Sequence, residues 1–212
     1  MLKTRFYTAE HDVDRKLSWF GVTRAELIEV ARQTLAARTD AIDIDVRSMP
    51  GQLSHLYGTR HLRMLFLNKG GRIDRAENVE SIVIEKLSAK IVFQNVDQAC
   101  SLFHSPLAIS AKGPAANRMI SNAQGRLFSP SEAPEVVRPD ALSKLNSTVW
   151  CFCMSSDGDN VNVELSLPSH LNGNNFSSFL ERIFIVVGGE WGRSIVPDND
   201  EFVEVLPTIT RL

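Results

Sequence analysis

The sequence predicts an α+β fold, in which helices pack on a mixed or mainly antiparallel sheet. Apolar residues recur at helical spacing in residues 23–38 and 52–67. Residues 79–96 and 148–167 instead are rich in β-branched residues or alternate apolar with polar positions, as strands do. Helices and hairpins come in separate runs rather than in strict alternation, and this order favours α+β over α/β architecture.

The first expected helix covers residues 23–38. Thr23 and Glu26 have the spacing of a capping box, in which two side chains accept hydrogen bonds from backbone N–H groups at the helix start. Apolar residues gather on one side of this segment and polar residues on the other. We therefore expect a surface helix with one buried stripe.

Residues 52–67 form the second expected helix, after the turn signal Pro50-Gly51. Its main apolar face would consist of Leu53, Leu56, Tyr57, Met64 and Leu67, and Leu62, Leu65 and Phe66 would add a second one. Arg60 falls within the main apolar face. The helix should end at the two glycines that follow Lys69, because glycine accepts the left-handed conformation and basic residues complement the helix dipole.

Positive charge is concentrated in the first third of the chain. Residues 1–73 carry 12 Lys and Arg against 8 Asp and Glu, whereas residues 151–212 carry 3 against 9. The basic helix and its end therefore supply candidate contacts to a phosphate-bearing or other macromolecular partner, namely Arg60, His61, Arg63, Lys69 and Arg72. The alternative is that Arg60 lays its stem on apolar neighbours and pairs with a carboxylate or with exposed carbonyl oxygens.

A second candidate for anion binding is the segment from Ser110 to Arg118. A Lys-Gly turn at Lys112 precedes a helix that is expected to start near Pro114, and the free N–H groups of a helix start attract anions. Lys112 and Arg118 would reinforce this attraction, so we expect both to contact the anion. The spacing matches neither the P-loop nor the dinucleotide fingerprint, so an ordinary loop and helix cap is the alternative.

Carboxylates offer a weaker, catalytic alternative. Asp43 and Asp45 would share one face of an extended segment and could hold Mg²⁺ or Mn²⁺, although such acids more often lie in solvated turns. A metal-dependent phosphodiester-cleaving or phosphoryl-transfer enzyme would draw its metal ligands from the acids between Glu10 and Glu85, which include these two. The chain has no Gly-x-Ser-x-Gly and no His-Glu-x-x-His motif, and no cofactor is expected.

The last third predicts a hairpin, a helix and a strand. The hairpin covers residues 148–167, with a turn at Asp157-Gly158 and a second strand that shows one face to solvent. Residues 174–189 have apolar residues at spacings of three and four and are expected to form a helix. Residues 201–209 would form a final edge strand.

Domain boundaries follow from composition. An N-terminal α+β part with the basic helix would cover residues 1–128, a proline-containing connector 129–146, and the hairpin-helix-strand part 147–212, all packed as one compact unit. No stretch is apolar enough to span a bilayer, and the N-terminus lacks the apolar centre of a secretory signal. We therefore expect a cytoplasmic protein.

The function expected from these features is that of a non-catalytic accessory protein. It would bind a protein or a nucleic acid through its basic first third, and a basic head opposite an acidic tail would also allow a homodimer.

Overall fold

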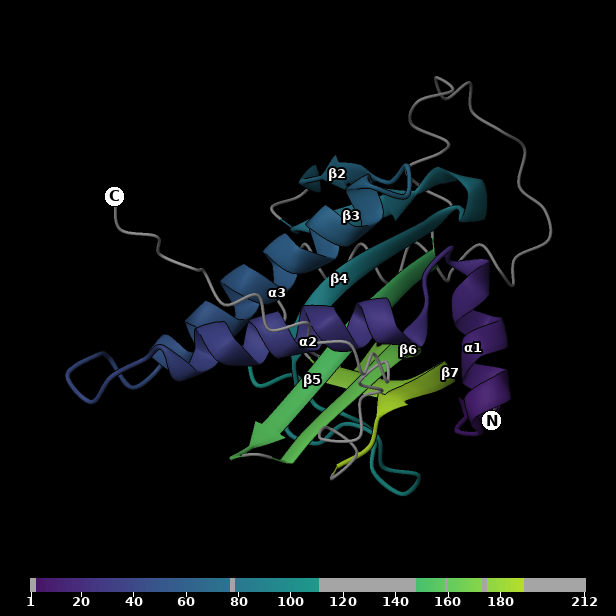
Figure 1. Cartoon of the computed structure of the whole chain (residues 1–212). Helices are drawn as coiled ribbons and strands as arrows, with labels where there is room; N and C mark the ends of the chain where they lie inside the picture. The colour runs from purple at the N-terminus through teal and green to yellow at the C-terminus, as the bar shows by residue number, and fades with distance from the viewer. Residues whose placement is uncertain (1–2, 77–78, 111–147, 159, 173–174, 189–212) are drawn as a thin grey trace, which may run out of the picture.

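The computed structural model describes residues 3–76, 79–110, 148–158, 160–172 and 175–188 (Figure 1). The helix expected near Pro114, the connector at 129–146 and the strand expected at 201–209 lie outside these residues. In chain order the elements are β1 (Arg5–Tyr7), α1 (Glu10–Trp19), α2 (Arg24–Thr39), α3 (Met49–Leu67), β2 (Arg72–Asp74), β3 (Ser81–Ile84), the 3-10 helix η2 (Glu85–Leu87), β4 (Ala89–Asn95), β5 (Thr148–Asp157), β6 (Asn160–Asn172) and β7 (Asn175–Val186).

The strands form one seven-stranded sheet in the order β1-β7-β6-β5-β4-β3-β2. β1 pairs in parallel with β7 and β4 with β5, and the other neighbours are antiparallel. The sheet is therefore mixed, which confirms the α+β fold predicted from the sequence. Strands that precede residue 111 and strands that follow residue 147 share this one sheet.

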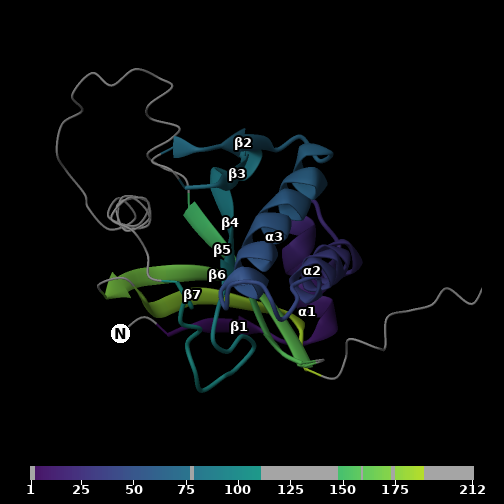
Figure 2. The same ribbon diagram turned by 90° about the vertical axis from the view of Figure 1, so that its left-hand side faces the viewer.

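All three α-helices of the described residues cover the same face of the sheet. α2 and α3 lie side by side across it, and α1 lies beside the β1–β7 end (Figures 1 and 2). The main hydrophobic core fills the space between helices and sheet and includes Leu17, Leu27, Phe66, Ile91, Phe152 and Ile183. β5 lies between β4 and β6 and is apolar on both faces, as expected of a central strand.

Short-range patterns in the sequence correctly predicted a helix start, a helix end and a hairpin turn. Thr23 and Glu26 form the predicted capping box at the start of α2. Gly70 follows α3 with φ +83°, in the left-handed region that only glycine adopts without strain. β5 and β6 form the predicted hairpin, with Gly158 at φ +57° in the turn.

The helix predicted over residues 174–189 is wrong, because this segment forms strand β7. The spacing of its apolar residues fits both a helix and a strand. In the strand, Ile183 and Ile185 face the helices, whereas Arg182 and Phe184 point to the other face of the sheet. Pairing with β6 on one side and β1 on the other decides in favour of the strand. β1 and α1 were not predicted at all.

A buried ion pair occupies the helix-free face of the sheet. Arg182 on β7 donates from Nε and from a terminal nitrogen to the Glu164 carboxylate on β6, at 2.8 and 2.6 Å. Its other terminal nitrogen donates to the carbonyl oxygens of Ser101 and His104 at 2.7 and 2.9 Å. Glu164 is fully buried, which corrects the expectation that the second strand of the hairpin shows one face to solvent.

The same carboxylate also holds the chain segment that follows β4. It accepts hydrogen bonds from the Ser166 hydroxyl and from the backbone N–H of Cys100. Burial raises the pKa of the Cys100 thiol well above its ordinary value, and the protonated thiol donates to the carbonyl oxygens of Val163 and Val186. The segment around residue 100 is therefore fixed to β6 and β7 by polar groups.

Helix α3 packs on the sheet through three small residues together with Leu62 and Phe66. Ser54, Gly58 and Thr59 are buried together with Leu62 and Phe66. The Gly58 backbone comes so close to β4 that a Cβ at this position would lie 2.3 Å from a ring carbon of Phe93. The predicted main apolar face of this helix is consequently its outer face.

Gly58→Ala should destabilise the protein by about 1–3 kcal/mol, because the helix or the Phe93 ring must move to admit a methyl group. Gly51→Ala, in the first turn of the same helix, is the matched control. Nothing lies within 4 Å of a Cβ there, so this variant should keep or gain stability. Urea unfolding measures both changes, and an equal effect of the two substitutions would contradict the close packing of α3 on β4.

Arg182→Met should cost on the order of 3–5 kcal/mol, because it leaves the Glu164 carboxylate buried without its counter-charge. The double variant Arg182→Met, Glu164→Gln removes both charges and should recover part of that loss. Equilibrium unfolding followed by circular dichroism tests this. A single variant that loses less than about 1 kcal/mol would show that the pair does not hold the sheet as described.

Candidate functional site

The outer face of α3 presents large apolar side chains to solvent. Leu56, Arg60, Met64 and Leu67 occupy positions i, i+4, i+8 and i+11 of the helix, which fall within about 80° of one another at 100° per residue. Leu56 is 53% exposed, Met64 55% and Leu67 44%. We call these four residues the α3 outer stripe.

The packing of α3 fixes the direction of this stripe. The buried residues Gly58, Leu62 and Phe66 lie on the opposite side of the helix, against the sheet. Figure 2 shows α3 lying across the sheet with α2 beside it. The stripe therefore sits on a helix that is held rigidly from behind.

Arg60 lies in the middle of the stripe and contacts an aromatic ring. Its guanidinium carbon is 4.5 Å from the centroid of the Tyr57 ring, and Tyr57 stacks on His61 with centroids 6.0 Å apart. Among the described residues no acid forms an ion pair with Arg60. The alternative in which Arg60 pairs with a carboxylate therefore finds no such carboxylate among these residues. Its charge is available to a partner.

His61 is held neutral by its surroundings. Burial lowers the pKa of His61, the positive charge of Arg60 lowers it further, and Glu29 opposes the two. Within the described part of the chain, its buried Nδ1 has no hydrogen-bond partner. His61 therefore acts here as a stacking ring rather than as a second cation.

The remaining predicted cations of this region are paired with acids. Arg63 is hydrogen-bonded to Glu80, and Arg72 contacts Glu85 at 3.2 Å. The structure brings both arginines to the region around α3, β2 and β3, but in each case a glutamate of the same region balances the charge.

Lys69 also has an acidic partner, 2.7 Å away at Glu26. The hydrogen bond from Lys69 lowers the pKa of Glu26, as does the backbone N–H of Thr23, and these effects outweigh partial burial. The capping glutamate of α2 thus ties the start of that helix to the end of α3. Lys69 serves the fold at this point.

Other predicted site residues are dispersed or lie outside the described residues. Lys112 and Arg118 belong to the latter group. Asp43 and Asp45 lie in the loop between α2 and α3, where Asp45 accepts a hydrogen bond from the backbone N–H of Ile42 at 2.9 Å. Across the described ranges, no group of three His, Cys, Asp or Glu side chains is placed to hold a metal ion.

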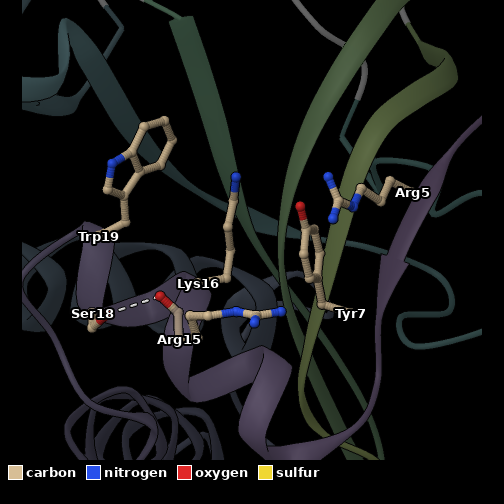
Figure 3. A pocket seen from close by; sticks show the side chains of 6 residues that line it. All are labelled: Arg5, Tyr7, Arg15, Lys16, Ser18 and Trp19. Carbon is tan, nitrogen blue, oxygen red and sulfur yellow. Dashed lines mark hydrogen bonds between the residues drawn. The ribbon is translucent and has the colours of Figure 1, made fainter.

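A cavity between α1 and β1 was missed by the sequence analysis. It has a volume of about 530 Å³, opens to solvent, and is lined by Arg5, Tyr7, Arg15, Lys16, Ser18 and Trp19 (Figure 3). The signal that could have revealed it is the helical spacing of Val13, Leu17 and Phe20, all of which are buried. This spacing makes residues 10–19 a helix and places the cationic and aromatic side chains on its other side.

Comparison of the chain with models of protein families, with curated proteins and with solved structures finds no match. Within the described residues, none of the helices combines the length and the apolar character that crossing a bilayer requires.

Arg60→Ala should raise the pKa of His61 toward its ordinary value, because the substitution removes a nearby positive charge while the imidazole stays partly buried. The chemical shift of the His61 imidazole protons, followed by NMR as a function of pH, measures this. Arg47→Ala, on an exposed residue of the α2–α3 loop, is the control and should leave the titration unchanged. A His61 that titrates identically in the wild type and in Arg60→Ala would contradict the described coupling.

Proposed function

We propose that the chain is a non-catalytic, cytoplasmic accessory protein that binds a protein partner through the α3 outer stripe. The observation that carries this proposal is the exposure of three large apolar side chains around an arginine that lacks an acidic partner in the described residues. Several large apolar side chains exposed on one face of a helix are typical of sites where another macromolecule docks.

The composition of the stripe supports a protein interface. Methionine and arginine are enriched at such interfaces, and an apolar centre with a charged group that fixes register is their usual arrangement. Because α3 is backed by the sheet, the helix backbone that carries Leu56, Met64 and Leu67 needs little ordering when a partner binds. Pre-organisation of this kind lowers the entropic cost of association.

A protein is a better candidate than a nucleic acid. Phosphate recognition depends on several uncompensated cations, and each contact contributes to the salt dependence of binding. Of the predicted cations on or next to α3, Arg63, Lys69 and Arg72 are paired with glutamates, whereas Arg60 has no acidic partner among the described residues. The exposed leucines and methionine have no role in a phosphate contact.

The partner surface should complement the stripe in shape and charge. An apolar groove or the apolar face of a helix would cover Leu56, Met64 and Leu67, and a carboxylate should face Arg60. A hydrogen bond between this carboxylate and the guanidinium would be charge-assisted and could be bidentate. A second copy of the chain is one protein that could provide such a surface.

The test is retention of a partner from lysate of the native cell on immobilised protein, with and without nuclease. Leu56→Glu with Met64→Glu should abolish retention, because it places two carboxylates in the apolar contact. Leu102→Glu is the matched control, since Leu102 is also 53% exposed but lies in the loop after β4. Circular dichroism should show that all variants remain folded.

The retained protein is then purified and titrated against wild-type and variant chains by calorimetry. Binding that survives nuclease treatment, is lost in the double variant and persists in Leu102→Glu supports the proposal. Retention that nuclease abolishes would assign the partner to the nucleic acids instead. Equal binding by the double variant and the control would exclude the α3 outer stripe as the interface.

A further inference from the structure

We infer that the cavity between α1 and β1 binds a carboxylate that carries an aromatic group. The cavity does not share a residue with the α3 outer stripe, so this inference stands apart from the proposed function. Its volume of about 530 Å³ lies in the range of sites for small organic ligands. Its six lining residues include three cations and two aromatic rings but no acid.

Lys16 forms the fixed centre of the cavity. Its Nζ lies 2.6 Å from the Glu181 carboxylate and within 5.6 Å of three aromatic ring centroids, those of Tyr7, Trp19 and Trp150. The Lys16 side chain is only 15% exposed. Lys16 is therefore a positioning residue, whose charge is balanced by Glu181 and whose stem and ammonium hold the rings in place.

Arg5 is the cation best placed to meet an anion. It is exposed on the edge strand β1, and its guanidinium lies 5.1 Å from the centroid of the Tyr7 ring. In Figure 3 the Tyr7 ring lies between the side chains of Arg5 and Lys16. Among the residues that the structure describes, no acid pairs with Arg5, so its hydrogen-bond donors are free to grip a carboxylate in the bidentate manner.

Arg15 adds a second donor from α1. It is hydrogen-bonded to Asp12, but both side chains of this pair are solvent-exposed or partly so, at 72% and 33%. Exposed ion pairs contribute little to stability, so Arg15 can exchange Asp12 for a ligand at small cost. Figure 3 shows its side chain directed toward Tyr7 and hence along the cavity.

Trp19 provides the apolar part of the site. It is 61% exposed, although its ring is fixed by Lys16, 4.5 Å from the centroid, and by edge-on contact with Phe20. A large aromatic side chain that is both exposed and held in place is a platform on which a ligand ring can stack. The combination of this platform with Arg5 defines a ligand that has one ring and one anionic group.

The charge balance favours a carboxylate over a phosphate. Glu181 neutralises Lys16 and Asp12 partly neutralises Arg15, which leaves about one uncompensated cation at Arg5. A singly charged carboxylate matches one guanidinium, whereas a phosphate group carries about −1.5 to −2 at neutral pH and is usually met by several cations. Two sources share this chemistry, a free aryl carboxylic acid and a peptide chain that ends in an aromatic residue.

Phenylacetate is the probe for the first source, and uncharged phenylacetamide of the same shape is its control. Binding to the full chain is followed by NMR shifts of the Trp19 indole N–H. Phenylacetate should saturate the shift at concentrations on the order of 10 mM or lower, and phenylacetamide should bind at least about tenfold more weakly, since a charge-assisted pair is worth about that factor.

Variants assign the two ends of the site. Arg5→Ala should weaken the binding of phenylacetate about tenfold but leave the binding of phenylacetamide unchanged. Trp19→Ala should weaken the binding of both compounds, and binding to this variant is followed by the NMR shift of Arg15 Nε–H. Arg47→Ala, which removes an exposed arginine of the α2–α3 loop, should change neither affinity. N-acetyl-Gly-Phe and its C-terminal amide repeat the test for a peptide terminus, and the tighter of the two carboxylates identifies the source.

Equal affinity for phenylacetate and phenylacetamide would overturn the inference, because Arg5 would then make no use of the anion. Absence of saturable binding of both carboxylates by a folded chain would also overturn it. Tighter binding of a twelve-residue oligothymidylate than of either carboxylate, lost in Arg5→Ala, would reassign the cavity to phosphate. None of these results bears on the α3 outer stripe, which is measured separately.

Discussion

The ion pair between Arg182 and Glu164 is the interaction on which the arrangement of the sheet depends. It joins β6 to β7 side by side and, through the Ser101 and His104 carbonyl oxygens, fixes the segment after β4 to the helix-free face. Every carboxylate oxygen is satisfied, so the cost of burying two charges is offset by a complete set of hydrogen bonds. Since β7 also carries β1 along its other edge, the position of the N-terminal strand follows from the same pair.

The two surfaces that carry the functional proposals arise from this frame in different ways. The α3 outer stripe exists because Ser54 and Gly58 allow the helix to approach β4 closely, which turns Leu56 and Met64 away from the core. The cavity exists because Glu181 of β7 anchors Lys16 beneath the rings that surround it. In both cases a contact on the buried side of an element determines which side chains are exposed to solvent on its opposite side.

Local signals in the sequence predicted much of the fold, whereas contacts distant in sequence decided the rest. The capping box at Thr23 and the turn at Gly158 depend on neighbouring residues, and both were found. The sequence predicts a helix where β7 lies, because the apolar spacing of this segment fits either period until its strand partners are known. The cations of the α3 region were recognised, but the glutamates that pair with Arg63 and Lys69 lie 17 and 43 residues away in the chain, beyond what spacing can reveal.

The parallel pairing of β1 with β7 also has a consequence for the order in which the protein can be completed. The Thr4 hydroxyl donates to the Phe179 carbonyl oxygen, 175 residues further along, and Lys16 meets Glu181 over a similar separation. Contacts this distant give a high contact order, and they cannot form on the ribosome until β7 has been synthesised. β1 therefore docks only after β7 has been synthesised, and the α1–β1 cavity forms only at that point.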